Sequence, residues 1–350
     1  MDRIGIIFGG KSPEHEVSLK SAVSVINAID KERHEIVCVG ITRDGQWKLY
    51  DGDVDALPDS SWEKTAVDLP IGDLAGMVDL VFPVLHGSFG EDGTIQGLFE
   101  MLDIPYAGCG VLGSSLAMDK VAAKMVFEAS GIPTSPFRPV MVADVQKDVD
   151  KEADLCEQQL PYPMFVKPAN AGSSVGISKV HNHDELVDGL KYAARFDRRL
   201  IVEAGIDARE IETGVIGNDE PLAASVGEIE VANEFYDYEA KYSDDVGTVI
   251  TVPADITNEL REEIRSLAVK TYIALDCAGL SRVDFLVDKK TGKAYVNEVN
   301  TLPGFTKYSM FPTLWADEGV PFTELIEKIV EYGYERYRVK DNRQTVYRDE

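Results

Sequence analysis

The sequence contains few cysteines, and it contains no long hydrophobic run. Its four cysteines, Cys38, Cys109, Cys156 and Cys277, are widely spaced and form no CxxC pair. This pattern predicts neither a zinc site nor a disulfide framework, and it favours buried free thiols in a reducing compartment. The apolar run from Ile4 to Phe8 is too short for a signal peptide or a membrane span. We therefore expect a cytoplasmic protein with no membrane partner.

Basic residues are scarce as well. The chain has 35 Lys and Arg residues against 61 Asp and Glu, which gives a formal net charge of −26. This balance argues against a nucleic-acid partner, whose phosphates require clustered Lys and Arg, although it permits a local basic pocket. The Gly-rich turn after the first strand has no GxGxxG motif, and the loop from Ala171 to Gly176 lacks the GlyLysSer/Thr ending of a Walker A loop, so these two segments predict neither a dinucleotide-binding turn nor a P-loop.

Hydrophobic patterning divides the 350 residues into three parts. Residues 1–120 begin with a strand, a Gly-rich turn, an amphipathic helix and a second strand, which predicts an open α/β domain. Residues 121–213 contain a helix, two strands around a Gly/Ser loop, a second helix and a further strand, and they resemble a small α+β lid. Residues 214–350 carry strands, a long helix, an acidic hairpin and a terminal helix.

The acidic hairpin, from Ser281 to Gly304, is the most informative segment. A turn at its LysThrGly sequence places Asp284 opposite Glu298 and Arg282 opposite Asn300. Because side chains alternate along a strand, these four residues share one face. We expect the other face to be apolar and to comprise Val283, Phe285, Val287, Tyr295 and Val299.

Two carboxylates that face each other across a hairpin repel, and a hard cation would relieve that repulsion. Oxygen ligands without His or Cys suit Mg²⁺, which commonly keeps phosphate oxygens in its coordination shell. The segment therefore predicts a site for Mg²⁺ and phosphate. The alternative is a solvated face whose charges lie close together by accident.

A second phosphate-binding feature precedes the hairpin. Small residues from Ala171 to Gly176 allow backbone N–H groups to approach an anion, and Lys167 and Lys120 offer point charges. The alternatives are a flexible hairpin and ordinary surface lysines. The densely aromatic and charged run from Glu234 to Tyr242 predicts a lid over a polar substrate, or an exposed loop.

Strand ends in the first domain supply further candidates, since open α/β sheets bind ligands at the carboxyl ends of their strands. Glu14 is a candidate for binding an ammonium group, and Glu16 for supporting the first turn of the following helix. His86 follows a later strand and could exchange protons near neutral pH, or it could be structural, with Glu91 orienting it.

Taken in order, several motifs resemble the D-alanine–D-alanine ligase family of the ATP-grasp fold. The resemblance runs from about Arg3 to Glu335 and rests on GGKSPEHEVSL, HGSFGEDGTIQG, MDK, FVKPANAGSSVGISKV, FYDYEAKY, SRVDF and NEVNTLPGFTKYSM. It implies a three-domain ATP-grasp architecture, with an N-terminal open α/β (pre-ATP-grasp) domain over residues 1–120, a central lid over 121–213 and a C-terminal metal and substrate domain over 214–350.

The resemblance also implies a reaction. Two D-alanines would be joined with ATP through a D-alanyl phosphate, giving D-Ala-D-Ala, ADP and phosphate for peptidoglycan precursor synthesis. Another ATP-grasp carboxylate–amine ligase, a D-Ala–D-lactate ligase and a non-catalytic nucleotide or amino-acid binder are the alternatives. Tyr242 favours the dipeptide product, whereas Ala204, where many relatives carry Lys or Gln, leaves the nucleotide preference open.

The family's site residues map onto this sequence by the same resemblance. The implied metal ligands, for two Mg²⁺ that Mn²⁺ could replace, are Asp284, Glu298 and Asn300. The implied ATP-binding residues are Lys120, Lys167, Ser173, Ser174, Glu203, Ile206, Glu210, Phe235, Lys241, Asn297 and Glu298. The implied catalytic residues are Glu14, His86, Ser173, Tyr242 and Arg282, and the implied substrate-binding residues are Glu14, His86, Arg282, Gly304, Ser309 and Met310. The family also implies a homodimer.

Overall fold

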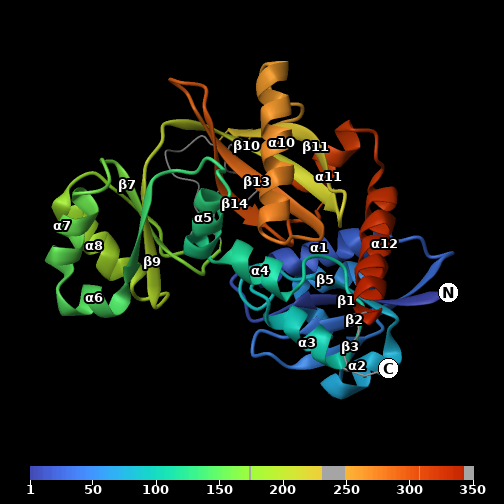
Figure 1. Ribbon diagram of the computed structural model, residues 1–350. Coiled ribbons are helices and arrows are strands. Elements are labelled where there is room, and N and C mark those ends of the chain that lie inside the picture. Colours follow the sequence, from blue (N-terminus) through green and yellow to red (C-terminus); the bar gives the residue numbers. More distant parts are fainter. Residues whose placement is uncertain (173–174, 231–248, 307, 343–350) are drawn as a thin grey trace, which may run out of the picture.

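The structure, a computed structural model, describes residues 1–172, 175–230, 249–306 and 308–342. Within these residues the chain forms three β-sheets, and helices pack on each of them (Figure 1). The first sheet contains parallel strands and the other two are antiparallel. The expected mixture of α/β and α+β architecture is therefore confirmed.

The first sheet has the strand order β4-β3-β2-β1-β5 and belongs to the N-terminal part of the chain. Its central strand, β1, pairs in parallel with β2 and β5, and residues 4–8 are fully buried because helices cover both faces. The predicted strand, turn, helix and strand are confirmed. The elements are β1 (Asp2–Gly9), α1 (His15–Ala28), β2 (His34–Ile41), β3 (Trp47–Tyr50), β4 (Val67–Asp68), α2 (Leu74–Met77), β5 (Leu80–Val84), α3 (Thr94–Leu102) and α4 (Val111–Met118).

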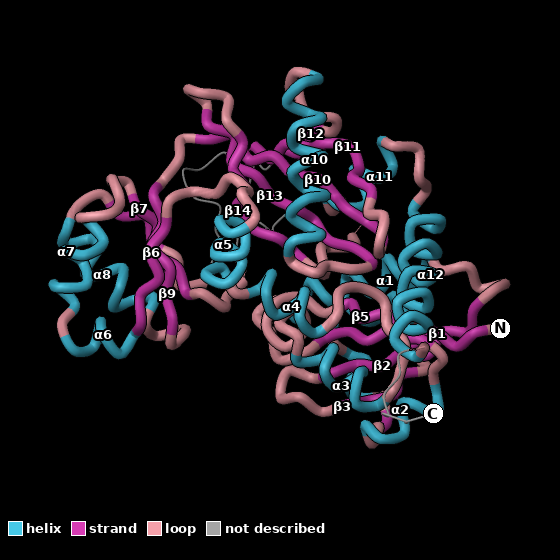
Figure 2. Tube along the Cα trace, in the orientation of Figure 1, coloured by secondary structure: helices cyan, strands magenta, loops and turns pink. Residues whose placement is uncertain are grey.

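The second sheet, β6-β9-β7-β8, forms the smaller body on the left of Figure 2, with α6, α7 and α8 on its outer side. Leu186 and Leu190 of α8 pack with Val166 and Val202 of the sheet. The sequence analysis did not predict β6, α6 or α7. The elements are α5 (Lys120–Ala129), β6 (Phe137–Met141), α6 (Val142–Lys147), α7 (Val149–Glu157), β7 (Met164–Pro168), β8 (Ser178–Val180), α8 (His183–Ala193) and β9 (Arg199–Ala204).

The third sheet has the order β12-β11-β10-β13-β14, and α10 covers one of its faces. Ile264 and Tyr272 of α10 pack against Val283 and Phe285 of β13. Residues that alternate with this apolar set therefore face away from α10. The elements are β10 (Ala208–Gly217), β11 (Leu222–Glu230), β12 (Val249–Thr251), α10 (Asn258–Ala274), β13 (Gly279–Asp288), β14 (Ala294–Asn300), α11 (Met310–Asp317) and α12 (Phe322–Asp341).

The pairing of the strands disagrees with one of the expected domain boundaries. The expected boundary between residues 213 and 214 falls inside β10, which pairs with β13 along its whole length from Ala208 to Gly217. We therefore propose that the lid ends in the connection between β9 and β10. Helix α12 also joins two parts of the chain, because Leu325 and Ile329 share one core with Ile4 and Leu19 of the first domain.

The cysteines have the state that the sequence predicts. All four are free and buried. Among the described helices, none combines the length and the apolar content that crossing a bilayer requires.

Candidate active site

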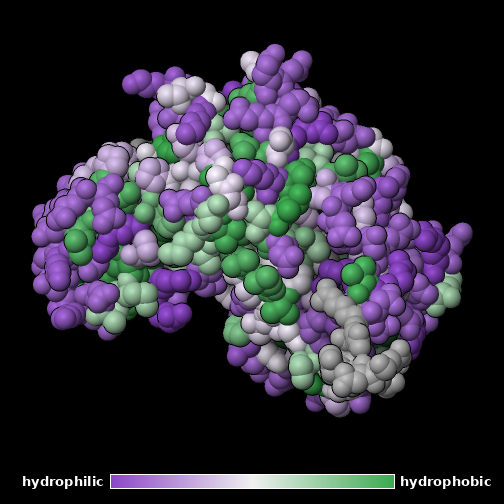
Figure 3. Space-filling view, in the orientation of Figure 1, coloured by the Kyte–Doolittle hydropathy of each residue, from purple (hydrophilic) through white to green (hydrophobic). Residues whose placement is uncertain are grey.

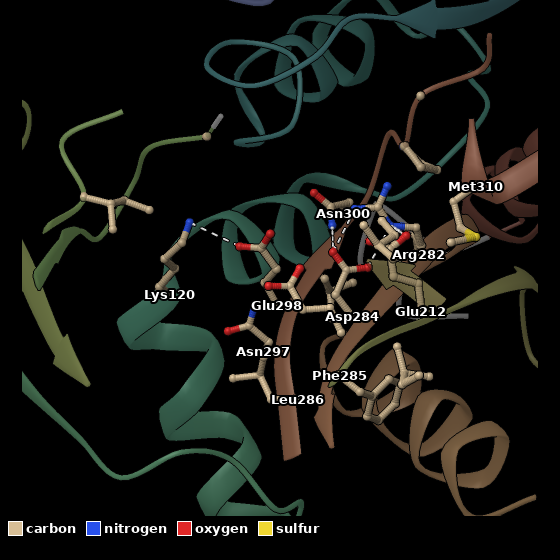
Figure 4. Close-up of a pocket in the computed structure, with 18 of the residues that line it drawn as sticks. Lys120, Glu212, Arg282, Asp284, Phe285, Leu286, Asn297, Glu298, Asn300 and Met310 are labelled. Atoms are coloured by element: carbon tan, nitrogen blue, oxygen red, sulfur yellow. Dashed lines mark hydrogen bonds and ion pairs between the residues drawn. The ribbon is translucent and has the colours of Figure 1, made fainter. Parts of the chain in front are cut away.

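One cleft of 1880 Å³ is lined by residues of the second and third sheets and their connections, and by α1 and neighbouring loops of the first domain. Every candidate residue that the structure describes lines this cleft, as Figure 4 illustrates for part of it. These residues are Glu14, His86, Lys120, Lys167, Glu203, Ile206, Glu210, Arg282, Asp284, Asn297, Glu298, Asn300, Gly304, Ser309 and Met310. The remaining candidates, Ser173, Ser174, Phe235, Lys241 and Tyr242, lie outside the described residues.

The acidic hairpin has the predicted register near the cleft. Asp284 pairs with Glu298 and Arg282 pairs with Asn300, and the four share the face turned away from α10. A β-bulge between Asp284 and Phe285 then shifts the pairing by one residue. This shift places Ala294 and Val296 in the core, so the prediction that Tyr295 lies on the apolar face is wrong. Bulges of this kind redirect side chains near functional sites.

Basic side chains already offset the charges of the two facing carboxylates. The Arg282 guanidinium donates from Nε and Nη2 to the two Asp284 oxygens, each at 2.7 Å, and Arg282 Nε lies 2.8 Å from Glu212 Oε2. Lys120 Nζ lies 3.6 Å from Glu298 Oε2. The repulsion by itself therefore does not require a cation, which corrects that step of the sequence argument.

The donor set nevertheless suits a hard cation. Asp284, Glu298 and Asn300 present carboxylate and amide groups to the same side of the hairpin (Figure 4). The Asn300 amide nitrogen donates to Asp284 Oδ2 at 2.9 Å, which leaves the Asn300 amide oxygen as the group that could act as a ligand. An all-oxygen set of this type fits Mg²⁺.

Arg282 is held as a permanent cation. Burial on its own lowers the pKa of this guanidinium, but Asp284 and Glu212 raise the pKa well above its usual value. Glu212 comes from the neighbouring strand β10, where it lies beside Asp284. The sequence analysis did not identify Glu212, because only the pairing of β10 with β13 brings it to the hairpin.

The lid contributes a buried group of charges around Glu203. Lys124 Nζ lies 2.7 Å from Glu203 Oε1, and Lys167 Nζ lies 2.5 Å from Glu203 Oε2. Lys124 uses its other two N–H groups on Thr134 Oγ1 and Ser135 Oγ. Burial alone raises the pKa of Glu203, but the two lysines outweigh it and lower that pKa to about 2. These ion pairs and hydrogen bonds hold the side chains that the lid contributes to the wall of the cleft.

We expect Glu203→Gln to lower the free energy of unfolding by about 3–5 kcal/mol at pH 7, because it leaves buried ammonium groups without a counter-charge. The folded-state pKa lies below the ordinary value of 4.5, so the stabilisation is present above that value and is lost as the pH falls through about 2. Urea unfolding at several pH values measures both effects. Exposed Glu259→Gln is the control, and equal stability of Glu203→Gln and the parent at pH 7 would refute the prediction.

Lys120 also supports the Gly/Ser loop. Its Nζ donates to the Ala171 carbonyl at 2.8 Å, and its backbone N–H donates to the Ala169 carbonyl at 3.0 Å. The preceding Asp119 caps α5 through Ala122 N–H and accepts a bond from the Asn170 side chain. The root of the loop is thus bonded to the start of α5.

His86 is buried and neutral. Its Nδ1 donates to the Leu302 carbonyl at 2.9 Å, and its Nε2 lies 3.1 Å from the Ser21 hydroxyl. Burial lowers the pKa of this imidazole, and the neighbouring Glu14 only partly opposes that effect. Glu91 does not orient His86 by a direct bond in the described contacts; its carboxylate instead accepts backbone N–H groups.

Glu14 lies against two loops. The residue immediately precedes α1 and does not cap it with its side chain, whereas Glu16 in the first turn pairs with Arg43. A Cβ atom on Gly87 would lie 2.4 Å from Glu14 Oε2, and one on Gly172 would lie 3.1 Å from it. Glycine at both positions therefore allows the carboxylate to sit between the turn after β5 and the Gly/Ser loop.

The far end of the cleft is formed by the loop that follows β14 and by the start of α11. Ser309 Oγ accepts from Thr306 N–H at 3.0 Å, and a Cβ on Gly304 would lie 2.9 Å from Ser309 Oγ. Met310 begins α11, whose N-terminus favours an anion such as a carboxylate.

These features define a class. The cleft has an acidic antiparallel hairpin on one wall and a lysine-bearing α+β lid on the other, and an open α/β domain closes its end. This arrangement is that of an ATP-grasp ligase. Solved ligases share this arrangement: a D-Ala:D-Ser ligase from Enterococcus faecalis is 37% identical, covers 95% of this chain and 99% of its own, and superposes with a TM-score of 0.86. A D-alanine–D-alanine ligase from Coxiella burnetii is 32% identical over 97% of this chain and 95% of its own, with a TM-score of 0.85.

Sequence comparison narrows the class to one family. The models for the D-ala D-ala ligase N-terminus and C-terminus match residues 3–109 and 126–331. A D-alanine–D-alanine ligase of Acetivibrio thermocellus is 47% identical over 96% of both chains, and one of Thermoanaerobacter sp. is 49% identical over 97% of this chain and 98% of its own. The chain belongs to the D-alanine–D-alanine ligase family.

Proposed function

We propose that the protein joins two D-alanines at the expense of ATP, to give D-Ala-D-Ala, ADP and phosphate for peptidoglycan precursor synthesis. The observation that carries the proposal is the opposition of charges across the cleft: the acidic face of the β13–β14 hairpin meets lysines, with Lys120 Nζ at the start of α5 lying 3.6 Å from Glu298 Oε2. A polyphosphate requires both kinds of group, since cations neutralise its oxygens and carboxylates hold its metal.

The reaction divides into two displacements. A carboxylate oxygen of the first D-alanine attacks the γ-phosphorus of ATP, and ADP leaves. The amine of the second D-alanine then attacks the acyl carbon of the D-alanyl phosphate, loses a proton, and phosphate leaves as the peptide bond forms. Phosphoryl transfer of this kind depends on positioning and charge neutralisation more than on covalent assistance by the protein.

The nucleotide would lie between the lid and the hairpin. Lys120 and Lys167 would bind phosphates, together with Lys241, Ser173 and Ser174 of the segments that are not described. Both oxygens of Glu203 are already paired with lysines, so we assign the adenine edge to the connection that carries Ile206, and the ribose to Glu210. Phe235 and Asn297 complete the proposed ATP site.

Asp284, Glu298 and Asn300 would hold two Mg²⁺, which Mn²⁺ could replace. Bound there, the metal would neutralise phosphate charge and align the γ-phosphate with the attacking carboxylate. Arg282, next to these residues, would stabilise the oxyanion of the tetrahedral intermediate, because its charge is fixed and its position is set by Asp284 and Glu212.

The amino acids would lie at the end of the cleft closed by the first domain. Glu14 would bind the ammonium group of the first D-alanine, and Tyr242 with Ser173 would close the lid over it. The carboxylate of the second D-alanine would bind at Ser309, Met310 and the backbone of Gly304. Neutral His86 would assist at that second site as a hydrogen-bonding group.

Phosphate release from Mg-ATP with D-Ala, L-Ala or no amino acid tests the proposal, with the product identified by mass. We expect release and dipeptide formation with D-Ala alone. No release with D-Ala, in folded protein that binds ATP, would overturn it. D-serine and D-lactate belong in the same assay: the resemblance to a D-Ala:D-Ser ligase makes D-Ala-D-Ser the second candidate product.

We further propose a homodimer in the cytoplasm, where ATP is available. Met101 at the end of α3 and Val111 and Leu112 at the start of α4 are exposed, and hydrophobic residues gather in the region of α4 in the view of Figure 3. Sedimentation equilibrium that returns the mass of one chain at micromolar concentration would refute the dimer.

A further inference from the structure

The backbone of Leu302 is held on both sides of its Cα by residues of the first domain. Its N–H donates to Glu91 Oε1 at 2.9 Å, and its carbonyl accepts from His86 Nδ1 at 2.9 Å. Leu302 follows β14 by two residues and lies 211 positions from Glu91 in the sequence. Two consecutive peptide units of the third domain, those on either side of the Leu302 Cα, are therefore fixed by two side chains that follow β5.

Glu91 also fixes its own loop. Its second oxygen, Oε2, accepts from Gly87 N–H at 2.8 Å, and Gly87 is the residue against which the Glu14 carboxylate packs. The carboxylate of Glu91 is buried, and burial together with Glu14 raises its pKa to about 8. Burying a carboxyl group costs free energy unless bonds such as these two offset it.

The clamped peptide lies at the root of the loop that forms the far end of the cleft. Leu302, Pro303 and Gly304 all line the cleft, and Gly304 approaches Ser309 at the start of α11. Because only one residue separates Leu302 from Gly304, a shift of the Leu302 peptide moves the Gly304 backbone with it. The position of this loop relative to Arg282 then depends on the first domain.

We propose that Glu91 is a positioning residue for the second amino acid: by holding the Leu302 and Gly87 N–H groups together, it sets the backbone that receives the acceptor's carboxylate. This rests on the proposed function, because the acceptor site is the one assigned above. Glu91 does not touch the reacting atoms; it acts through the peptide units of Leu302 and Gly87.

The side-chain type matters at this position. Two oxygens that both accept backbone N–H groups require a carboxyl group, and the amide of Gln would direct an N–H donor toward one of the two peptide donors. Glu91→Gln keeps the size of the side chain and breaks one bond of the clamp. Glu91→Asp keeps the carboxyl group, but its side chain is one methylene too short to bond both loops.

The test measures initial rates of phosphate release against D-alanine concentration at saturating Mg-ATP. The curve gives one Michaelis constant for each of the two bound D-alanines. For Glu91→Gln we expect the constant for the second D-alanine to rise about 10- to 100-fold, as for a buried peptide N–H left without an acceptor. The constant for the first D-alanine, and the constant for ATP from a second series at saturating D-alanine, should stay within about twofold.

Asp92→Asn is the matched control. Asp92 lies in the same loop and also accepts two backbone N–H groups, but both come from its own loop, Phe89 and Thr94. We expect this variant to leave the second constant unchanged. Hydrogen exchange of the peptide containing Leu302 gives a second readout, since Glu91→Gln should accelerate exchange there and Asp92→Asn should not.

The outcomes separate the two proposals. A parent protein that forms no dipeptide overturns the proposed function. If the parent forms dipeptide, and Glu91→Gln changes the constants for ATP and for both D-alanines equally or changes none of them, the positioning role is overturned. If Glu91→Gln does not fold, Glu91→Asp takes its place, and it must raise the second constant and accelerate Leu302 exchange for the proposal to stand.

Discussion

Glu298→Gln is expected to lower the rate of phosphate release by about 100- to 1000-fold, because it removes one charge from the group that would hold the metal against the phosphates. Little stability should be lost. The Glu298 side chain is partly exposed, and its contact with Lys120 at 3.6 Å contributes at most modestly to folding. Steady-state release with D-Ala and Mg-ATP, together with a thermal melt, measures both quantities.

The matched control for this change is Glu263→Gln, an exposed carboxylate on α10, which covers the face of the sheet opposite the cleft. This variant should retain the parent's rate. Full activity of purified, folded Glu298→Gln would remove Glu298 from the proposed metal ligands. A Mg²⁺ titration adds a second criterion, since loss of a ligand should shift the half-saturating Mg²⁺ concentration upward.

Arg282→Lys is expected to lower kcat by about 100- to 1000-fold with a smaller change in the KM values, as for the loss of an oxyanion donor. Lysine keeps a positive charge between Asp284 and Glu212, so the buried carboxylates keep a counter-charge. It lacks the planar fork that bonds both Asp284 oxygens and holds the guanidinium in place. Single-turnover measurements of dipeptide formation distinguish a slower chemical step from weaker binding.

The control for Arg282→Lys is Arg138→Lys. Arg138 also pairs with a buried carboxylate, Glu152, at 2.9 Å, but it lies in the lid and does not line the cleft. If both variants lose activity equally, the loss reflects disturbed ion pairing in general and the oxyanion role is wrong.

The hairpin was the most predictable part of the molecule. Alternation and a recognisable turn suffice to pair Asp284 with Glu298, because both follow from local rules. The bulge that removes Tyr295 from the core was not predictable, since nothing in the local pattern marks the extra residue. Lys124 was missed for a related reason: it lies on a helix with an ordinary amphipathic pattern, and only packing against β9 brings it to Glu203.

Contacts between segments that are far apart in the sequence could not be predicted from the sequence pattern. Glu91 is separated from Leu302 by 211 positions, and no spacing rule relates an acidic residue in one loop to a backbone N–H in another. Glu212 is recognised as a neighbour of Asp284 only from the pairing of β10 with β13. The motifs therefore identified the residues of the site, while the fold determined which of them bond to each other.

Helix α12 has a consequence for how the chain is made. Its residues Leu325, Ile326, Ile329 and Val330 complete a core that begins with Ile4 and Leu19, close to the other end of the described chain. A ribosome delivers the first sheet long before α12, so the apolar surface beneath α12 stays uncovered until that helix has been made. The lid, whose core consists of residues between Val140 and Ala204, can fold during that interval, whereas the core of the first domain is complete only when α12 has been made.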